Sequence, residues 1–223
     1  MKVVLFGATG MIGQGTLLEC LDDPEVTRVL AVVRRSTGRT HAKLEELVVQ
    51  DFVDLSPVAD RLTGYDACLF CLGVSAAGMK EAAYRTITYD YALAAAKTLS
   101  KANPSLTFCY VSGAGTDSTE RGFQMWARVK GKTENDLLAL PMAGAFMFRP
   151  GYIQPVRGVT SATGWYRTIY AIVGWLYPAV SAMFPKSVMT SETLGKALIR
   201  AAKHGAPKRV LEPRDIIELV AAA

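Results

Sequence analysis

Histidine is scarce in this sequence, which has only two, His41 and His204. Neither has a cysteine or a second histidine at the spacing of a metal site. Of the four cysteines, Cys68 and Cys71 are three apart in a stretch that reads as a buried strand. Residues three apart on a strand face opposite sides of the sheet, so this pair cannot share a metal or close a disulfide. We therefore expect no metal site.

A long apolar run is missing near the first residue, and like charges do not gather into runs. The opening MKVVLFGATG carries only four consecutive apolar residues before its glycines, which is too short for the core of a signal peptide. We therefore expect a cytoplasmic protein with reduced thiols. The 25 basic and 20 acidic residues are interspersed and give a net charge of +5, so we expect no binding to nucleic acid.

One later segment, residues 164–184, suggests a membrane. It is apolar with a single charge, Arg167, but Pro178 interrupts it, and a spanning helix needs about 20 apolar residues. The same pattern is typical of a lid helix that packs over a site. We expect no membrane attachment, with attachment through 164–184 as the alternative. A homodimer is compatible with these features.

Short apolar runs alternate with longer helical patterns along most of the chain. We predict strands at 3–6, 28–33, 46–50, 67–73, 106–112 and 145–150, and helices at 11–21, 78–100 and 122–140. Such alternation is typical of a parallel sheet covered on both faces. The sequence predicts an α/β fold, a single Rossmann-type domain over 1–223 with a doubly wound parallel sheet, in which 151–208 forms a small C-terminal substrate cap. Further expected elements are helices at 164–177 and 191–203, a strand at 209–213 and a final helix that starts at Pro213.

The stretch GATGMIG follows the first predicted strand and opens the first predicted helix. Its first glycine, Gly7, lets the chain turn sharply; Gly10 lets backbone N–H groups approach a pyrophosphate; and Gly13 lets the helix pack close to the sheet. The start of the helix adds N–H donors and a positive dipole end. We predict a dinucleotide site here, with contacts from Gly7, Thr9, Gly10, Met11 and Ile12.

The end of the second predicted strand, VVRRS, bears on the choice of dinucleotide. A site that prefers NAD places Asp or Glu there to bind the ribose hydroxyl groups. Arg34 and Arg35 would instead pair with the 2′-phosphate of NADP, so we predict NADP rather than NAD; the alternative is two solvated arginines in a turn. The other predicted cofactor contacts are Asp51 and Phe52 near the adenine, and Cys71, Leu72 and Gly73 along the middle of the dinucleotide.

Six stretches together carry a family resemblance: GATGMIG, VVRR, YVSGAG, ARVKGKTEN, FRPG and TSETLGKAL. With them the chain resembles an atypical short-chain dehydrogenase/reductase, of the kind known as NAD-dependent epimerase/dehydratase or NmrA-like NAD(P)-binding proteins, near the Tat-interacting-protein oxidoreductase group. The resemblance covers most of the chain. It implies a Rossmann-type domain, a bound NADP and a Ser-Tyr-Lys catalytic set, and it implies no single substrate.

Carried over by position, the resemblance makes Ser112 the residue that holds a substrate oxygen. Lys130 matches the lysine that holds the nicotinamide ribose and favours ionisation of the catalytic tyrosine. The backbone of Pro150 and Gly151 matches the segment near the nicotinamide carboxamide, which adds both residues and Lys130 to the cofactor contacts. Trp126 stands at the tyrosine position and breaks the pattern. Its indole N–H can donate a hydrogen bond but does not ionise in this range, so it could not relay a proton.

Trp126 leaves three hypotheses open. Another acid replaces the tyrosine; the substrate needs little acid assistance; or the protein binds NADP as a sensor that works through a protein partner and catalyses nothing. We expect an NADP-dependent oxidoreductase acting on a small or apolar carbonyl or alcohol, because the predicted cap is short for a sugar nucleotide. The candidate acids, by residue type only, are Tyr84, Tyr89, Tyr110 and Tyr152.

The catalytic set that we predict is Ser112, Lys130 and Trp126. Trp126 and Lys130 are four residues apart and share one face of a helix, and we expect the GKTEN that follows to place polar residues on the other faces. The alternative for Trp126 is helix packing. The alternative for Ser112 is a turn residue that ends a strand, before Gly113 and Gly115.

Overall fold

A computed structural model describes residues 1–159 and 187–221 of the chain. A seven-stranded sheet has the order β3-β2-β1-β4-β5-β6-β9, and each neighbouring pair is parallel. This confirms the predicted α/β, Rossmann-type doubly wound sheet. The strands are β1 (Lys2–Phe6), β2 (Arg28–Val33), β3 (Leu44–Val48), β4 (Ala67–Phe70), β5 (Thr107–Val111), β6 (Gly144–Phe148) and β9 (Val210–Leu211).

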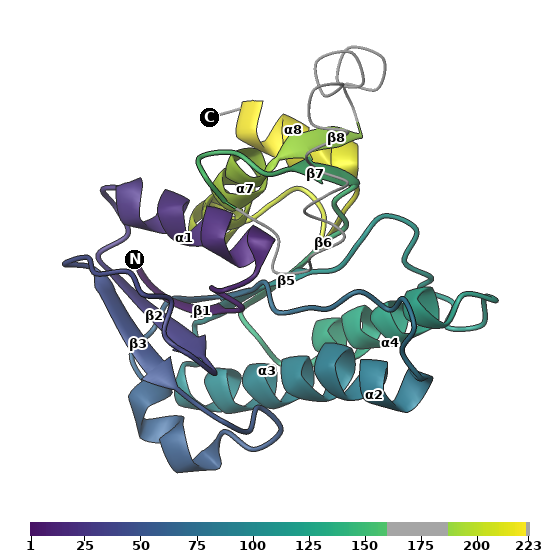
Figure 1. The fold of residues 1–223 in the computed structure, drawn as a ribbon, viewed down its shortest axis with the longest axis horizontal. Coiled ribbons are helices and arrows are strands. Elements are labelled where there is room, and N and C mark those ends of the chain that lie inside the picture. The colour runs from purple at the N-terminus through teal and green to yellow at the C-terminus, as the bar shows by residue number, and fades with distance from the viewer. Residues whose placement is uncertain (160–186, 222–223) are drawn as a thin grey trace.

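Helices cover both faces of the sheet (Figure 1). On one face lie α1 (Met11–Asp22), α7 (Ser191–His204) and α8 (Pro213–Ala221); on the other lie α2 (Glu81–Arg85), α3 (Tyr91–Ala102) and α4 (Met125–Ala139). The single helix predicted at 78–100 is α2 and α3 joined by a π-helical turn, η2 (Thr86–Asp90). A 3₁₀ helix, η1 (Ser56–Leu62), was not predicted.

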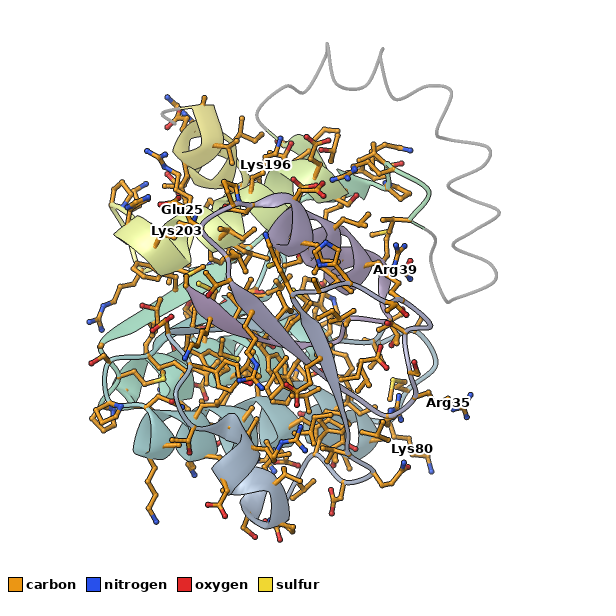
Figure 2. All side chains as sticks on the ribbon, turned by 90° about the vertical axis from the view of Figure 1, so that its left-hand side faces the viewer. Glu25, Arg35, Arg39, Lys80, Lys196 and Lys203 are labelled. Atoms are coloured by element: carbon orange, nitrogen blue, oxygen red, sulfur yellow. The ribbon has the colours of Figure 1, made fainter. Side chains whose placement is uncertain are left out.

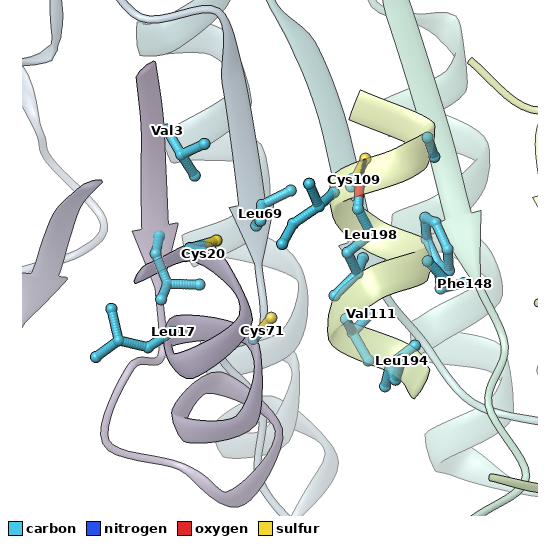
Figure 3. Packing of buried hydrophobic residues seen from close by; sticks show 14 of the residues in the cluster. Val3, Leu17, Cys20, Leu69, Cys71, Cys109, Val111, Phe148, Leu194 and Leu198 are labelled. Carbon is cyan, nitrogen blue, oxygen red and sulfur yellow. Dashed lines mark hydrogen bonds between the residues drawn. The ribbon is translucent and has the colours of Figure 1, made fainter. Parts of the chain in front are cut away.

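Two apolar clusters, one on each face, hold these layers together. Because side chains alternate along a strand, Val3 of β1 belongs to the cluster under α1 and α7, whereas Val4 belongs to the cluster over α3. Figure 3 shows part of the first cluster, where Leu17 of α1 and Leu198 of α7 pack with strand residues. The same alternation puts Cys71 in the first cluster and Cys68 in the second. All four cysteines are buried free thiols.

Two strand ends differ from the predicted ones for a visible reason. The third strand lies at 44–48 rather than 46–50, because it pairs with β2 from Leu44 onward. The fourth strand ends at Phe70 rather than 73, since the chain leaves the sheet where it passes over Gly7. A separate pair of strands, β7 (Tyr152–Gln154) and β8 (Val188–Thr190), was also not predicted. Its pairing joins segments far apart in the sequence.

The predicted cap, 151–208, is described only in part. The helix expected at 164–177 and the apolar segment 164–184 both lie outside the described residues. Of the remainder, α7 packs on α1 so closely that a Cβ at Gly195 would lie 2.8 Å from the Cγ atom of Glu19. Whether 151–208 forms a substrate cap stays a prediction. In the described residues, no helix combines the length and the apolar character that a membrane span requires.

Candidate functional site

The candidate site lies beyond the carboxyl ends of β1 and β4, where the sheet changes winding direction. From β1 the chain enters α1 on one face, and from β4 it enters α2 and α3 on the other (Figure 1). Ligands of doubly wound folds bind in the crevice at such a switch point. The loops after β1, β4, β5 and β6 carry the residues described below.

Two glycines of the first loop are required by the packing of the chain itself. Gly7 has a φ of +82°, which L side chains rarely adopt, and a Cβ there would lie 2.6 Å from the backbone nitrogen of Leu72. A Cβ at Gly13 would lie 2.0 Å from the carbonyl oxygen of Gly7. The predicted roles of Gly7 in the turn and of Gly13 in close packing therefore have a steric basis.

Three other glycines have no such basis within the described chain. A Cβ at Gly10 would meet only the Gly7 oxygen, at 3.4 Å, and one at Gly73 or Gly113 would meet no atom within 4 Å. None of the three has the left-handed φ that favours glycine. They follow β1, β4 and β5 respectively, at one edge of the sheet. The described residues thus leave open a cradle at the switch point, which fits a bound dinucleotide.

The start of α1 is built to receive an anion. Its N-cap, Gly10, offers no side chain to the first turn, and that turn contains no acidic residue. Gly10 donates its own N–H to the Gly7 oxygen at 2.9 Å and accepts from the N–H of Gln14 at 2.8 Å, which fixes the loop. Thr9 is exposed, and Met11 and Ile12 are half-buried. Uncapped N–H groups with a positive dipole end favour a phosphate.

Arg34 and Arg35 follow β2 directly and both are exposed. Among the described residues neither forms an ion pair, nor does Arg39. Figure 2 shows Arg35 and Arg39 projecting outward from the same margin of the molecule. The intervening turn is fixed by Glu46 of β3, whose carboxylate accepts from the backbone N–H of Thr37 at 2.8 Å. The three basic side chains therefore have no ion-pair partner in the part of the chain that the structure describes, and they lie on a defined turn.

The two residues predicted near the adenine differ in the exposure of their side chains. The Asp51 carboxylate is exposed and accepts the N–H of Val53 at 2.8 Å. Phe52 is only 2% exposed and packs against the rings of Phe6 and Tyr91. Its side chain belongs to the core, so only its backbone could face a ligand.

Beyond β4, Cys71 points inward while the residues after it are open to the crevice. Its Sγ lies 3.6 Å from the Thr16 hydroxyl, and burial raises the pKa of the thiol to about 12. It is therefore a neutral packing residue. Leu72 is half-buried and Gly73 is exposed. Within the described part of the chain, no three His, Cys, Asp or Glu side chains group as metal ligands would.

The Ser112 hydroxyl has a defined hydrogen-bond direction. Thr116 donates its hydroxyl proton to the carbonyl oxygen of Gly113 at 2.7 Å. The Ser112 and Thr116 hydroxyl oxygens are 3.0 Å apart, so Ser112 must be the donor of that second bond. The Ser112 backbone is also fixed, since its N–H donates to the Phe148 oxygen at 2.7 Å. In this arrangement Ser112 Oγ offers a ligand lone pairs and no proton.

The Pro150–Gly151 segment lies beside the loop that follows Ser112; its place near the nicotinamide carboxamide stays a prediction. The carbonyl oxygen of Pro150 accepts the N–H of Ala114 at 2.9 Å, which extends the β5–β6 pairing beyond the strand ends. Gly151 is needed for a close backbone approach, because a Cβ there would lie 2.3 Å from the Ser187 oxygen.

Lys130 reaches the carboxyl end of β5 from α4. Its Nζ lies 3.5 Å from the carbonyl oxygen of Val111, next to Ser112, and 5.5 Å from the centre of the Tyr110 ring. No described carboxylate forms an ion pair with it. Burial lowers the pKa of Lys130 to about 8, against a smaller opposing effect of Glu134 one turn further along α4.

Trp126 packs on the loop after Ser112. The six-membered ring of its indole would lie 3.5 Å from a Cβ at Gly115, whose φ is +83°. A Cβ at Gly131 would lie 1.8 Å from the Asp117 carbonyl oxygen, so α4 contacts that loop through its backbone. Asp117 accepts the N–H of Gly122 at 2.6 Å and anchors the loop before α4. Trp126 and Lys130 thus share the side of α4 that faces β5 and its loop.

The four candidate tyrosines are not equivalent. Tyr110 and Tyr84 are 1% exposed, and burial raises the pKa of both. Tyr89 donates its hydroxyl to the Asp136 carboxylate at 2.6 Å, which raises its pKa. Tyr152, which follows β6, donates its hydroxyl to Gln154 Oε1 at 2.9 Å. Only the last follows a strand at the edge where the candidate site lies.

Sequence reasoning missed a buried ion pair behind the site. Arg149, at the end of β6, donates from Nε to both carboxylate oxygens of Glu134 at 3.1 Å. It also bonds Glu212 at 3.0 Å and the Ser118 hydroxyl at 2.5 Å. Glu134 is 1% exposed and Thr133 is 0% exposed, so the expectation that GKTEN keeps its polar residues on other faces is wrong for these two. Arg149 is the partner that permits the burial of Glu134.

A cavity of about 430 Å³ lies elsewhere, at the far end of α1 beside α7. Its charged lining includes Lys203, which pairs with Asp23 at 2.7 Å and Glu25 at 2.5 Å. Figure 2 shows Glu25 and Lys203 side by side, away from Arg35. Because its cations are already paired and it lies at the other end of α1 from the glycine loop, this cavity is not part of the candidate site.

Comparison with family models gives no match for this chain. Three curated relatives are similar over nearly the whole length. Protein FMP52, mitochondrial, of Meyerozyma guilliermondii is 25% identical over 219 residues, covering 97% of this chain and 91% of the relative. The protein of the same name from Emericella nidulans is 28% identical over 207 residues, which cover 90% of this chain and 86% of the relative. The one from Eremothecium gossypii is 27% identical over 225 residues, which cover 99% of this chain and 97% of the relative.

These names correct the expectation of a cytoplasmic location, because all three relatives are named as mitochondrial. The expectation rested on the lack of a long apolar run near the start. That run marks a secretory signal, whereas mitochondrial transit peptides are amphipathic and rich in arginine. The pattern that was tested therefore bore on export only.

Solved structures share the fold at low identity. An oxidoreductase of the short-chain dehydrogenase/reductase family from Burkholderia thailandensis has a TM-score of 0.71 at 15% identity, covering 99% of this chain and 92% of the other. WbmF of Bordetella bronchiseptica, solved with NAD+, has a TM-score of 0.68 at 14% identity, and the match covers 99% of this chain and 76% of WbmF. A UDP-N-acetylglucosamine 4-epimerase from Methanobrevibacter ruminantium has a TM-score of 0.67 at 16% identity, and the match covers 94% of this chain and 74% of the epimerase. The broad resemblance is thus confirmed as a shared fold, and the narrower group stays a prediction.

Proposed function

We propose that this chain binds a nicotinamide dinucleotide, with NADP preferred, and works as an oxidoreductase of the short-chain dehydrogenase/reductase type on a small or apolar carbonyl or alcohol. The observation that carries the proposal is the open cradle at the switch point. Gly10, Gly73 and Gly113 lie at one edge of the sheet without a steric need for glycine, beside the uncapped start of α1. Neighbours of the same fold include structures solved with NAD+, which supports the choice of ligand.

Each part of the site has a role in this proposal. The N–H groups at the start of α1 hold the pyrophosphate, and the unpaired Arg34 and Arg35 hold the 2′-phosphate. Lys130 and the backbone of Pro150 and Gly151 face the nicotinamide end. When bound, the nicotinamide supplies or accepts a hydride. The chain's own residues bind the dinucleotide, place the substrate beside the carboxyl end of β5 and move the proton.

Titration with NADPH and NADH, followed by calorimetry, tests the cofactor. We expect tighter binding of NADPH, and we expect Arg34→Ala to narrow the gap because it removes one charge from the 2′-phosphate site. Lys97→Ala, an exposed residue on α3, is the matched loss of one positive charge and should leave the gap unchanged. Equal affinities of the wild type for both dinucleotides would contradict the NADP preference. Failure to bind either would contradict the proposed function.

Turnover is tested by NADPH oxidation over a panel of aldehydes, ketones and quinones. Oxidation with any of them supports the oxidoreductase.

The second candidate is a dinucleotide-responsive regulator that works through a protein partner, and one observation favours it. Phe123 is 100% exposed on the loop before α4, which Arg128 fixes by donating to the carbonyl oxygens of Gly122 and Phe123 at 2.9 Å. Tight dinucleotide binding without turnover on any substrate would favour the regulator.

We extend the proposal to a mitochondrial location, which rests on the names of the three curated relatives. Fractionation of cells of the source organism, or expression of the chain with a C-terminal tag in yeast, tests it. Co-sedimentation of the protein with a mitochondrial marker supports this location, and its recovery with soluble markers alone contradicts it.

A further inference from the structure

We propose that Lys130 is the proton donor of this site, delivering a proton from Nζ to the oxygen of a carbonyl substrate in place of the missing tyrosine. The inference rests on the proposed function, since it needs a carbonyl reduction to serve. It is carried by the positions of the hydroxyl, indole and amine groups around the end of β5. These positions remove the other candidates one at a time.

Ser112 is removed as a donor by the direction of its hydrogen bond. Thr116 has already given its only proton to the Gly113 carbonyl oxygen, so the proton of Ser112 is directed to Thr116. Ser112 Oγ can therefore accept a hydrogen bond from a ligand or from Lys130. It has no free proton for a carbonyl oxygen while this chain of hydroxyls stays in place.

Trp126 and most of the tyrosines are removed by chemistry and location. The indole N–H of Trp126 donates a hydrogen bond but does not release its proton in this pH range. Tyr84 and Tyr110 are enclosed in the core, and Tyr89 already donates to the Asp136 carboxylate. Tyr152 alone has a hydroxyl on a segment after β6, where it donates to Gln154. Tyr152 is thus the alternative that an experiment must separate from Lys130.

Lys130 meets the geometric conditions for an acid. Its Nζ lies at the end of β5, 3.5 Å from the oxygen of Val111, the residue that precedes Ser112, so it can donate to a substrate oxygen placed at that end of the strand. It carries three protons on one nitrogen. One can bond the backbone and another a cofactor ribose, which leaves one for the substrate. No other described amine comes within hydrogen-bonding distance of the β5 carboxyl end.

The surroundings of Nζ also suit a group that must lose and regain a proton. The described titratable groups that interact with it are Glu134 on the same helix and Tyr110 on β5. Behind these, Glu134 pairs with Arg149, which follows β6, and Tyr110 lies near Tyr84 of α2. Glu134 is occupied by Arg149 at 3.1 Å, so it does not fix the lysine as a permanent cation. Burial brings the Lys130 pKa to about 8, and an acid works best when its pKa lies near the working pH.

The carbonyl carbon accepts a hydride, which comes from a reduced nicotinamide dinucleotide that is thereby oxidised. The C=O π electron pair moves to the oxygen, and that oxygen takes the proton from Lys130 Nζ. The product is an alcohol and Lys130 is left as a neutral amine, which regains a proton from water. The reverse reaction uses the neutral amine as the base.

The first test measures the titration of Lys130 without any turnover. In protein labelled with ¹³C-lysine, the Cε resonance of Lys130 is assigned by its loss in Lys130→Arg and followed by NMR from pH 6 to 11 (about the range that spans the relevant pKa values). We expect a midpoint near 8. Lys132, whose side chain is 42% exposed and bonds Asp136 at 3.0 Å, is the internal reference, because that bond raises its pKa above the ordinary value of a lysine. A Lys130 midpoint above 10 would overturn the inference.

The second test measures the pH dependence of carbonyl reduction. We expect a wild-type rate that is level below the Lys130 midpoint and falls about tenfold per pH unit above it. Lys130→Arg keeps the positive charge but cannot release a proton near neutral pH. It should therefore slow reduction by about 10²–10⁴-fold, and calorimetry should show that the dinucleotide still binds. Lys132→Arg is the matched control, with no change expected in rate or profile.

The two proposals fail in different ways. If wild-type protein binds and turns over but Lys130→Arg keeps the wild-type rate and profile, the proton-donor role is wrong and the proposed function stands. If Tyr152→Phe abolishes the high-pH fall and Lys130→Arg does not, Tyr152 is the donor. If wild-type protein binds no dinucleotide in calorimetry, the proposed function fails, and with it the reaction that the donor would serve.

Discussion

Replacing Gly73 by alanine separates a glycine kept for a ligand from one kept for the fold. In the described chain, no atom beyond the two neighbouring residues lies within 4 Å of the added Cβ, and the φ of Gly73 lies outside the left-handed region. The folded state therefore accepts the methyl group, while the unfolded chain loses conformational freedom. We expect the free energy of unfolding to stay level or rise by about 0.4–1 kcal/mol. The dinucleotide should bind at least about tenfold more weakly, because the methyl group enters the open cradle and costs roughly 1.4 kcal/mol or more.

Gly13→Ala is the matched control for this prediction. Its Cβ would lie 2.0 Å from the Gly7 carbonyl oxygen, so the first loop or α1 must shift, and we expect a loss of at least about 1–3 kcal/mol in stability. Urea unfolding gives both stabilities, and calorimetry with NADPH gives the affinity of Gly73→Ala. A Gly73→Ala protein that is destabilised, or that binds as tightly as wild type, would refute the interpretation of the cradle.

Three further predictions concern α4. Lys130→Met should raise the free energy of unfolding by up to about 3 kcal/mol at pH 7. The pKa of Lys130 falls from its usual 10.5 to about 8 in the folded protein, so the charged lysine destabilises the folded state. This destabilisation is full below pH 8, decreases as the pH rises, and is absent above pH 10.5. Urea unfolding that shows the same gain at pH 11 would contradict this. Glu134→Gln should cost about 1.5–3 kcal/mol by removing the buried charge that Arg149 bonds and leaving it the exposed Glu212, whereas the exposed Glu218→Gln should cost less than about 1 kcal/mol; equal losses would refute the difference. Trp126→Tyr should raise any reductase rate in the NADPH assay, and no gain would mean that position 126 does not face the substrate oxygen.

The sheet could be predicted because each buried strand is a short run of consecutive apolar residues. RVLAVV matches β2 at both ends, since a strand covered on both faces is apolar throughout. The helix after the glycine loop also begins where predicted, at Met11. These features depend on local composition and on a loop whose steric requirements fall within a few residues. Three of the four tyrosines offered as acids could not be removed from sequence, because only their burial and hydrogen bonds in the fold distinguish them.

The remainder depends on contacts between distant segments. The burial of Glu134 follows from Arg149, fifteen positions along the chain, and a lone Glu on a helix gives no sign of such a partner. Gly131 is explained only by the Asp117 carbonyl that lies against it. The hydrogen-bond direction at Ser112 depends on Thr116, which no motif marks. Each of these contacts shapes the site, but none involves the motif spacing from which the site was predicted.

The contrast between Arg149 and the arginine pair after β2 bears on how such a protein can change over time. Arg149 bonds residues from three other segments, namely Glu134, Ser118 and Glu212, so its position depends on all of them, and Glu134 is the buried one. Arg34 and Arg35 have no ion-pair partner in the described chain and can be exchanged singly. If Arg34 and Arg35 select the dinucleotide as we propose, single substitutions can change that preference, whereas the residues behind Lys130 depend on one another and must change together.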